Sequence, residues 1–195
     1  MQEAGKSCAG FNTDGFLNLH GDSTKNRVTP ILDTALIPPR IFTDQMVHIF
    51  FQEWAPLFPV LHKPTFLQLY AQFAEKPQHV THQSKIAQLY LVFGIAALSS
   101  EILDLEQLSS CEDRWRTALD ALVMDNTLVT LQCLILAQLF CIVKGDYKCL
   151  QHYKAIAVGM SHRLGLHQSQ KRFSFGALTI ETRKRVFWSL YTVDW

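Results

Sequence analysis

Apolar residues recur with helical spacing along most of the chain, from about residue 43 to its end. In each of seven successive segments they fall three or four positions apart, which places them on one face of an α-helix. Alternating apolar and polar runs bounded by tight turns, the pattern of strands, do not occur in this region. The pattern predicts an all-α fold, a multi-helix bundle of about seven helices that begin near residues 43, 64, 84, 106, 127, 146 and 179.

Residues that favour helix ends mark several of these boundaries. Gly145 and Gly165 follow the last apolar positions of the fifth and sixth helices, where glycine commonly ends a helix in the left-handed conformation. Leu166 is then expected to pack back across the end of the sixth helix. Side chains able to accept a hydrogen bond from the first turn are expected as N-terminal caps: Thr43, Asn126 or Thr127, and Thr179.

The first two helices are separated by the proline-rich stretch "APLFPVLHKP" at residues 55–64. Pro56 and Pro59 forbid a continuous helix, because proline has no N–H and clashes with the preceding turn. This stretch is predicted to be an extended apolar connector. Pro64, by contrast, suits the first turn of the second helix, where the missing N–H costs nothing.

The two most apolar stretches are "IAQLYLVFGIAAL" (86–98) and "LQCLILAQLFCIV" (131–143). Each is shorter than the roughly 20 residues that a membrane-spanning helix needs, and each contains glutamine. They are apolar nearly all round, which is typical of a helix surrounded by other helices. We therefore expect two buried central helices and no membrane segment.

Residues 1–36 differ from the rest of the chain. They lack a sustained period and hold four of the nine glycines, so the sequence predicts a flexible or disordered leader, followed by one domain over residues 37–195. Apolar residues make up 48% of the chain and charged residues 18%, which is enough for a sizeable core. The net charge of +1 does not indicate a free-standing DNA binder.

The chain has five cysteines at wide spacings, and no apolar signal sequence precedes them. An odd number without a secretory signal favours a reducing intracellular compartment and free thiols that are mostly buried. The expected free cysteines are Cys8, Cys111, Cys133, Cys141 and Cys149.

Candidate metal and catalytic residues are few. Cys149 and His152 lie one helical turn apart, but zinc requires three or four ligands and no second pair has the usual spacing. The pairs His162–His167 and 79–82 are better explained as surface histidines. No nucleophile elbow, phosphate-binding glycine loop or HExxH motif occurs. We expect no enzyme, no metal site and no cofactor.

The closing segment "ETRKRVFWSLYTVDW" is predicted to be an amphipathic helix. Its apolar stripe places the aromatic side chains toward a core, while Glu181, Arg185 and Ser189 share the solvent side. Glu181 and Arg185 have the favourable i, i+4 order for an ion pair. Asp194 falls within the apolar stripe, where a carboxylate needs a partner from another segment. The run Arg183–Arg185 in the first helical turn opposes the helix dipole, which suggests specific acidic partners.

Three blocks of this sequence resemble the regulatory domain, or middle homology region (xylanolytic-activator type), of fungal binuclear zinc-cluster transcription factors. The blocks are "PPRIFTDQMVHIFFQEWAPLFPVLHKPTFLQLY", "TLQCLILAQLFCIVKGDYKCLQHYKAIAVGMSHRLGLH" and "ETRKRVFWSLYTVDW", which follow the order of that family and cover about residues 37–195. The matching positions that we expect to have structural or regulatory roles are Pro59, His62, Pro64, Gln132, Gly165, His167, Glu181, Arg183, Arg185, Trp188 and Asp194.

The resemblance implies an all-helical regulatory domain in the nucleus that tunes a neighbouring DNA-binding and activation apparatus. It implies regulation through intramolecular packing, through protein partners or self-association, or through a small-molecule effector. The six-cysteine zinc cluster of the family has no counterpart here, because the sequence contains no CxxC, so DNA binding would need a domain not present in this chain. The family continues beyond Asp194, which implies an incomplete domain. The alternative is a stand-alone helical module that binds a small apolar ligand or a protein partner.

Overall fold

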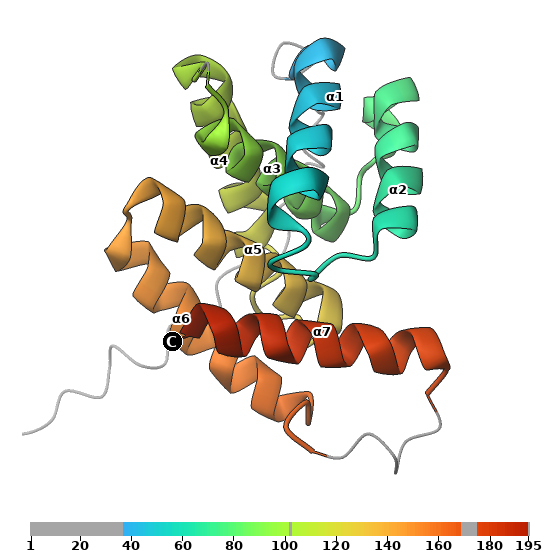
Figure 1. Cartoon of the computed structure of the whole chain (residues 1–195), viewed down its shortest axis with the longest axis vertical. Coiled ribbons are helices and arrows are strands. Elements are labelled where there is room, and N and C mark those ends of the chain that lie inside the picture. The colour runs from blue at the N-terminus through green and yellow to red at the C-terminus, as the bar shows by residue number, and fades with distance from the viewer. Residues whose placement is uncertain (1–36, 102, 169–174, 195) are drawn as a thin grey trace, which may run out of the picture. The chain divides into compact units, whose positions relative to one another are not determined.

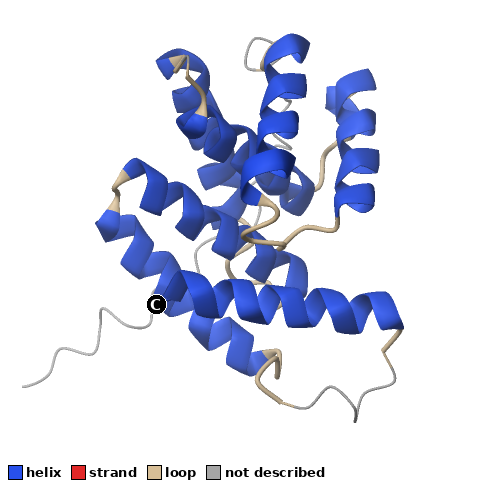
Figure 2. Cartoon of the chain, in the orientation of Figure 1, coloured by secondary structure: helices blue, strands red, loops and turns tan. Residues whose placement is uncertain are grey.

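The computed structural model describes residues 37–101, 103–168 and 175–194. Within them the chain is helical and contains no strand, as Figure 2 shows, which confirms the all-α prediction. The leader predicted for residues 1–36 lies outside the described residues, and its boundary stays a prediction. The helices are α1 (Arg40–Ile49), which continues into a π-helical turn (Phe50–Trp54), α2 (Lys63–Glu75), a short 3₁₀ turn (Pro77–His79), α3 (Gln83–Ser99), α4 (Leu105–Asp120), α5 (Leu128–Lys144), α6 (Tyr147–Arg163) and α7 (Ala177–Asp194).

The two most apolar helices, α3 and α5, form the centre of the bundle. α3 packs against α1, α4 and α5, and α5 packs in turn against α6 and α7 (Figure 1). Residues 89–97 of α3 and 130–141 of α5 are buried without exception, which confirms the two predicted central helices. Each large apolar side chain buried in this way contributes about 1.5–3 kcal/mol. None of the described helices combines the length and the apolar character needed to cross a membrane.

The closest approach of the two central helices depends on Gly94. A Cβ atom at this position would lie 2.9 Å from Cε2 of Phe140, which is too close for two carbon atoms. The Phe140 ring therefore lies against the backbone of α3, and its centroid is 5.2 Å from the fully buried Trp115 ring of α4. Three helices thus meet at one phenylalanine, where dense packing makes any change of volume costly.

Most of the predicted helix ends are confirmed. The hydroxyl of Thr127 accepts a hydrogen bond from the amide of Thr130 at 3.1 Å and caps α5. Gly145 and Gly165 have φ values of 79° and 65°, the left-handed conformation that glycine adopts without a steric penalty. Leu166 is buried across the end of α6, as expected.

Two predicted caps are wrong. α1 begins at Arg40, so Thr43 lies inside the helix, where its hydroxyl contacts the carbonyl of Arg40 at 3.0 Å and the hydroxyl of Tyr70 at 2.9 Å. The fixed φ of Pro39 starts this helix one turn earlier than the apolar pattern suggested. α7 likewise begins two residues before Thr179, which leaves Thr179 in the first turn with an exposed side chain.

The cysteine prediction is confirmed for the four cysteines in the described residues. Cys111, Cys133 and Cys141 are buried free thiols, and Cys149 is partly buried and free. Burial raises the pKa of each of the three buried thiols to about 12. These thiols stay protonated at neutral pH and act as small apolar core groups.

α7 crosses α5 and α6 at the end of the bundle (Figure 1). Its buried stripe includes Val186 and Leu190, as predicted, but also Ser189, which was expected on the solvent side. Trp188 and Tyr191 are 60% and 48% exposed, so the prediction that the aromatic side chains point to the core is wrong for these two. Arg183 is also buried on this helix, where it makes a polar contact described below. The side chain of Asp194 lies outside the described residues, and its inward placement stays a prediction.

Candidate functional site

The first and second of the three sequence blocks are joined by the side chain of Gln132. Gln132 lies on α5, is only 7% exposed, and donates a hydrogen bond from Nε2 to the carbonyl of Val60 at 2.7 Å. Val60 belongs to the connector between α1 and α2, 72 residues earlier in the sequence. A second glutamine, Gln88 of α3, donates to Oε1 of Gln132 at 3.4 Å. The pair satisfies a buried carbonyl of the connector, which would otherwise cost about 1–3 kcal/mol.

The connector ends at a compact start of α2. Nδ1 of His62 and the hydroxyl of Thr65 lie 2.8 Å apart and form a hydrogen bond. Pro64 stands in the first turn of α2, as predicted. Because proline fixes φ and His62 contacts the first helical turn, the direction in which α2 leaves the connector is well defined.

The second and third blocks are joined by Arg183. One Nη atom of Arg183 donates to the carbonyl of Leu164 at 2.6 Å, at the C-terminal end of α6. The guanidinium also stacks over the ring of Phe175, with its central carbon 4.9 Å from the ring centroid. Carbonyls at this end of a helix carry partial negative charge, so a cation is favourable there. Burial lowers the pKa of Arg183, although an arginine remains protonated at neutral pH.

Two further motif positions surround the same helix end. Gly165 provides the left-handed turn, and His167 then lies beside His162, with the two ring centroids 5.0 Å apart. The predicted pair of Glu181 and Arg185 is confirmed, with 2.9 Å between carboxylate and guanidinium and both side chains about half exposed. An ion pair as exposed as this one stabilises the helix by a few tenths of a kcal/mol.

A groove with two lobes lies where the connector, α2 and the first half of α7 approach one another. The first lobe has a volume of about 470 Å³ and lies between the connector and α7. The second lobe has a volume of about 530 Å³ and extends over α2, α3 and α5. Four residues, two from the connector and two from α7, line both lobes: Leu61, His62, Leu178 and Thr182.

The groove collects six of the eleven predicted positions from all three blocks. The first lobe is lined by Pro59, His62, Pro64, Glu181 and Arg185, and the second by Gln132 and also by His62. Gly165, His167 and Arg183 lie instead at the junction of α6 and α7. Trp188 is on the outer face of α7, away from both groups of residues.

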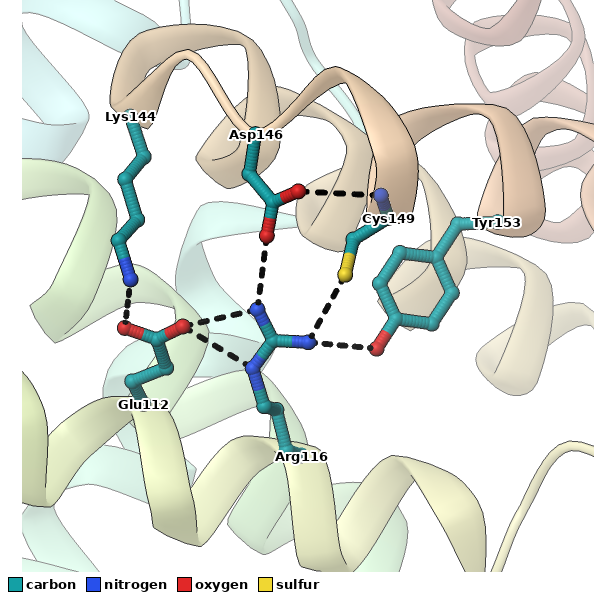
Figure 3. A network of polar contacts seen from close by, with 6 residues as sticks. All are labelled: Glu112, Arg116, Lys144, Asp146, Cys149 and Tyr153. Carbon is teal, nitrogen blue, oxygen red and sulfur yellow. Dashed lines mark hydrogen bonds and ion pairs between the residues drawn. The ribbon is translucent and has the colours of Figure 1, made fainter.

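A separate polar network connects α4 to the start of α6, and the sequence interpretation missed it (Figure 3). Arg116 forms two hydrogen bonds to Glu112, at 3.0 and 2.8 Å, and one to Asp146 at 3.3 Å. Lys144 also pairs with Glu112, and the hydroxyl of Tyr153 is 3.4 Å from the Arg116 guanidinium. The i, i+4 order of Glu112 and Arg116 was the available signal. Because its charges are mutually paired, we interpret this network as a structural clamp between helices.

Asp146 also caps α6 by accepting a hydrogen bond from the amide of Cys149 at 3.1 Å. This bond, together with the nearby Arg116, lowers the pKa of the Asp146 carboxyl. Among the residues that the structure describes, no three histidine, cysteine or acidic side chains lie close enough to hold a metal ion.

Comparison with known proteins identifies the family. The family model of the fungal specific transcription factor domain matches residues 47–195. The chain is 59% identical, over its whole length, to 21% of the transcriptional activator protein acu-15 of Neurospora crassa. It is 28% identical over 166 residues to an ABC-transporter-regulating transcription factor of Aspergillus oryzae, covering 81% of this chain and 18% of that protein.

A third relative is the probable transcription factor FUP6 of Fusarium proliferatum, 28% identical over 167 residues, which cover 77% of this chain and 23% of that protein. The chain thus spans about a fifth of the length of these relatives. No solved structure matches it. The chain therefore belongs to the fungal specific transcription factor domain family, a family of regulatory proteins and not of enzymes.

Proposed function

We propose that this chain is the regulatory module of a fungal zinc-cluster transcription factor, which modulates transcription through intramolecular, partner or effector contacts. The observation that carries the proposal is the way in which the three sequence blocks meet. Gln132 joins the connector to α5, Arg183 joins α7 to the end of α6, and the groove lies between them. These side chains set the relative positions of the helices, and a partner or effector that binds one arrangement better than another would shift the population toward it.

The charges of α7 support a module without DNA-binding residues of its own. Arg183 is buried against the Leu164 carbonyl, and Arg185 is paired with Glu181. Lys184, the remaining residue of the basic triplet, is exposed, and a single lysine is far from the several phosphate contacts of a typical DNA-binding surface. DNA binding and nuclear residence would then belong to the whole transcription factor, of which this module tunes the output.

A reporter experiment tests the regulatory role. The 195-residue chain is inserted between an unrelated DNA-binding domain and an unrelated activation segment, and reporter output is compared with that of the same fusion without the chain, at equal protein levels. We expect the inserted chain to change the output severalfold. Equal output with and without a folded chain would contradict the proposal.

A gel-shift experiment with the isolated chain tests the proposal that the module has no DNA-binding residues of its own. We expect no sequence-selective binding to duplex DNA at physiological salt, because a net charge of +1 is far from the strong basic excess of a typical DNA-binding domain. Selective binding that weakens steeply as salt is added would show that the chain carries DNA-binding residues.

A further inference from the structure

We propose that the two-lobed groove between the connector and α7 binds a small organic anion with an apolar body. The inference deepens the proposed function and rests on it in one respect: such a ligand would be an effector of the regulatory module. The groove itself, and its charges, are properties of the described residues alone.

The walls of the first lobe are mostly apolar. They include Phe51, Ala55, Pro56 and Val60, together with Leu178 from the first turn of α7. Leu178 is 57% exposed although it lies over the groove, so its side chain is not covered by the bundle. An apolar molecule in the lobe would remove this surface from water, which is favourable.

The charged residues around the groove are mostly positive. Lys63 and Arg185 line the first lobe and Lys85 lines the second, whereas Glu181 is the one carboxylate among the lining residues. Glu181 is already paired with Arg185 at 2.9 Å. Three cations against one carboxylate leave an excess of two positive charges, so the potential in the groove favours an anion.

Neither lysine is neutralised by the protein itself. Among the described residues, Lys63 and Lys85 form no ion pair with a carboxylate. The Lys63 ammonium instead lies 5.4 Å from the centroid of the Phe51 ring, a cation–π contact that keeps it above the apolar wall. An apolar group beside an available cation is the combination that recognises an amphipathic anion.

The size of the groove also suits a small molecule. Lobes of about 470 and 530 Å³ lie within the usual range of 300–1,000 Å³ for small-molecule sites. Because the lobes share four lining residues, a ligand can fill one lobe or extend into both. The walls of the first lobe come from the end of α1's π-helical turn, the connector, the start of α2 and α7, and those of the second also from α3 and α5, so a bound ligand would stabilise the arrangement of these segments.

The test uses the 195-residue chain labelled with ¹⁵N and three probes: octanoate, 1-octanol and formate. We expect octanoate to cause saturable shifts of the amide signals of Leu178 and Thr182. Octanol, which lacks the charge, should bind about tenfold more weakly at low salt, and formate, which lacks the apolar body, should not bind measurably.

Four variants assign the contributions. Lys63→Gln and Lys85→Gln should each weaken octanoate binding about two- to fivefold, the usual effect of one partly exposed charge, and should leave octanol binding unchanged. Leu178→Asn should weaken both probes. The matched control Lys148→Gln, an exposed lysine of α6 away from the groove, should bind octanoate as the original chain does. Thermal unfolding of each variant confirms that the fold is kept.

Several outcomes would overturn the proposal. Octanol binding as tightly as octanoate, saturable shifts confined to Trp188 and Tyr191, or an acidic peptide that binds the groove when octanoate does not would each do so. The reporter experiment separates this inference from the proposed function. Failure of octanoate to bind while the inserted chain still changes reporter output rejects only the ligand, whereas binding without any reporter effect rejects only the regulatory role.

Discussion

The central pair α3 and α5 and the peripheral helix α7 contribute to the fold in different ways. α3 and α5 are buried over most of their length, and most of their buried side chains are apolar. α7 buries a narrow stripe around Val186 and Leu190 and exposes Trp188 and Tyr191. A polar contact from Arg183 to the Leu164 carbonyl also joins it to the end of α6. The comparison indicates a stable core to which a more weakly held helix is attached beside the two-lobed groove.

The largest expected effect separates the two regions directly. Phe140→Ala should lower the free energy of unfolding by about 3–5 kcal/mol, because it leaves a cavity where α3, α4 and α5 meet. Trp188→Ala, an aromatic truncation on the exposed face of α7, should change it by less than about 0.5 kcal/mol. Urea unfolding followed by circular dichroism measures both. Similar losses in the two variants would contradict the distinction between core and periphery.

A smaller effect compares two i, i+4 ion pairs. The Glu112 side chain is 13% exposed, and its carboxylate pairs with both Arg116 and Lys144. Glu112→Gln removes this carboxylate and should lower the free energy of unfolding by about 1–2 kcal/mol. Glu181→Gln breaks the half-exposed pair with Arg185 and should cost a few tenths of a kcal/mol. Both values come from the same unfolding experiment. If Glu112→Gln lowers the free energy of unfolding no more than Glu181→Gln does, the network of Figure 3 does not stabilise the fold and its structural role is contradicted.

The smallest effect concerns acid unfolding. The pKa of Asp146 is lowered in the folded chain, first by its hydrogen bond to the Cys149 amide and then by Arg116. A carboxyl with a lowered pKa stabilises the fold above its ordinary value of 3.8, and this contribution is lost as the pH falls through the folded-state pKa. Asp146→Asn should therefore flatten the loss of stability below about pH 4. Stability measured from pH 6 to pH 2 checks this, and an unchanged slope would show that Asp146 plays no part.

The sequence predicted the core well because one physical property decides it. The stretches at 86–98 and 131–143 are apolar all round and too short for a membrane, which leaves a buried helix as the consistent interpretation. The ends at Gly145 and Gly165 followed for a similarly local reason, since glycine is favoured at a left-handed turn.

The sequence predicted only part of the face that α7 buries, because Val186 and Leu190 are buried as expected but other residues are not placed as expected. A helical wheel weighs apolar residues and cannot foresee that Arg183 turns inward to reach a carbonyl 19 residues earlier. Ser189 is also buried and Trp188 is exposed, which the wheel did not indicate. Thr43 was misassigned because α1 begins at Arg40, one turn before the start that the apolar pattern suggested.

The candidate site was only half visible in the sequence. The resemblance identified positions in three blocks, but it did not say that Gln132 holds the Val60 carbonyl or that the blocks enclose a groove. These are contacts between residues tens of positions apart, which spacing along the chain does not reveal. Lys63, Lys85 and Leu178, which carry the ligand proposal, had no pattern that marked them beforehand.

The most direct test of regulation through the junction of α6 and α7 is the reporter output of an inserted chain in which the contact between these helices is removed. Arg183→Met removes the contact with Leu164, and its neighbour Lys184→Met removes an equal charge from an exposed position. Hydrogen exchange on each fusion shows whether α7 is released while α3 and α5 stay protected. The account predicts that Arg183→Met releases α7 and abolishes the severalfold change in output, whereas Lys184→Met behaves as the original chain does. A released α7 with unchanged reporter output would contradict the claim that the module regulates through this junction.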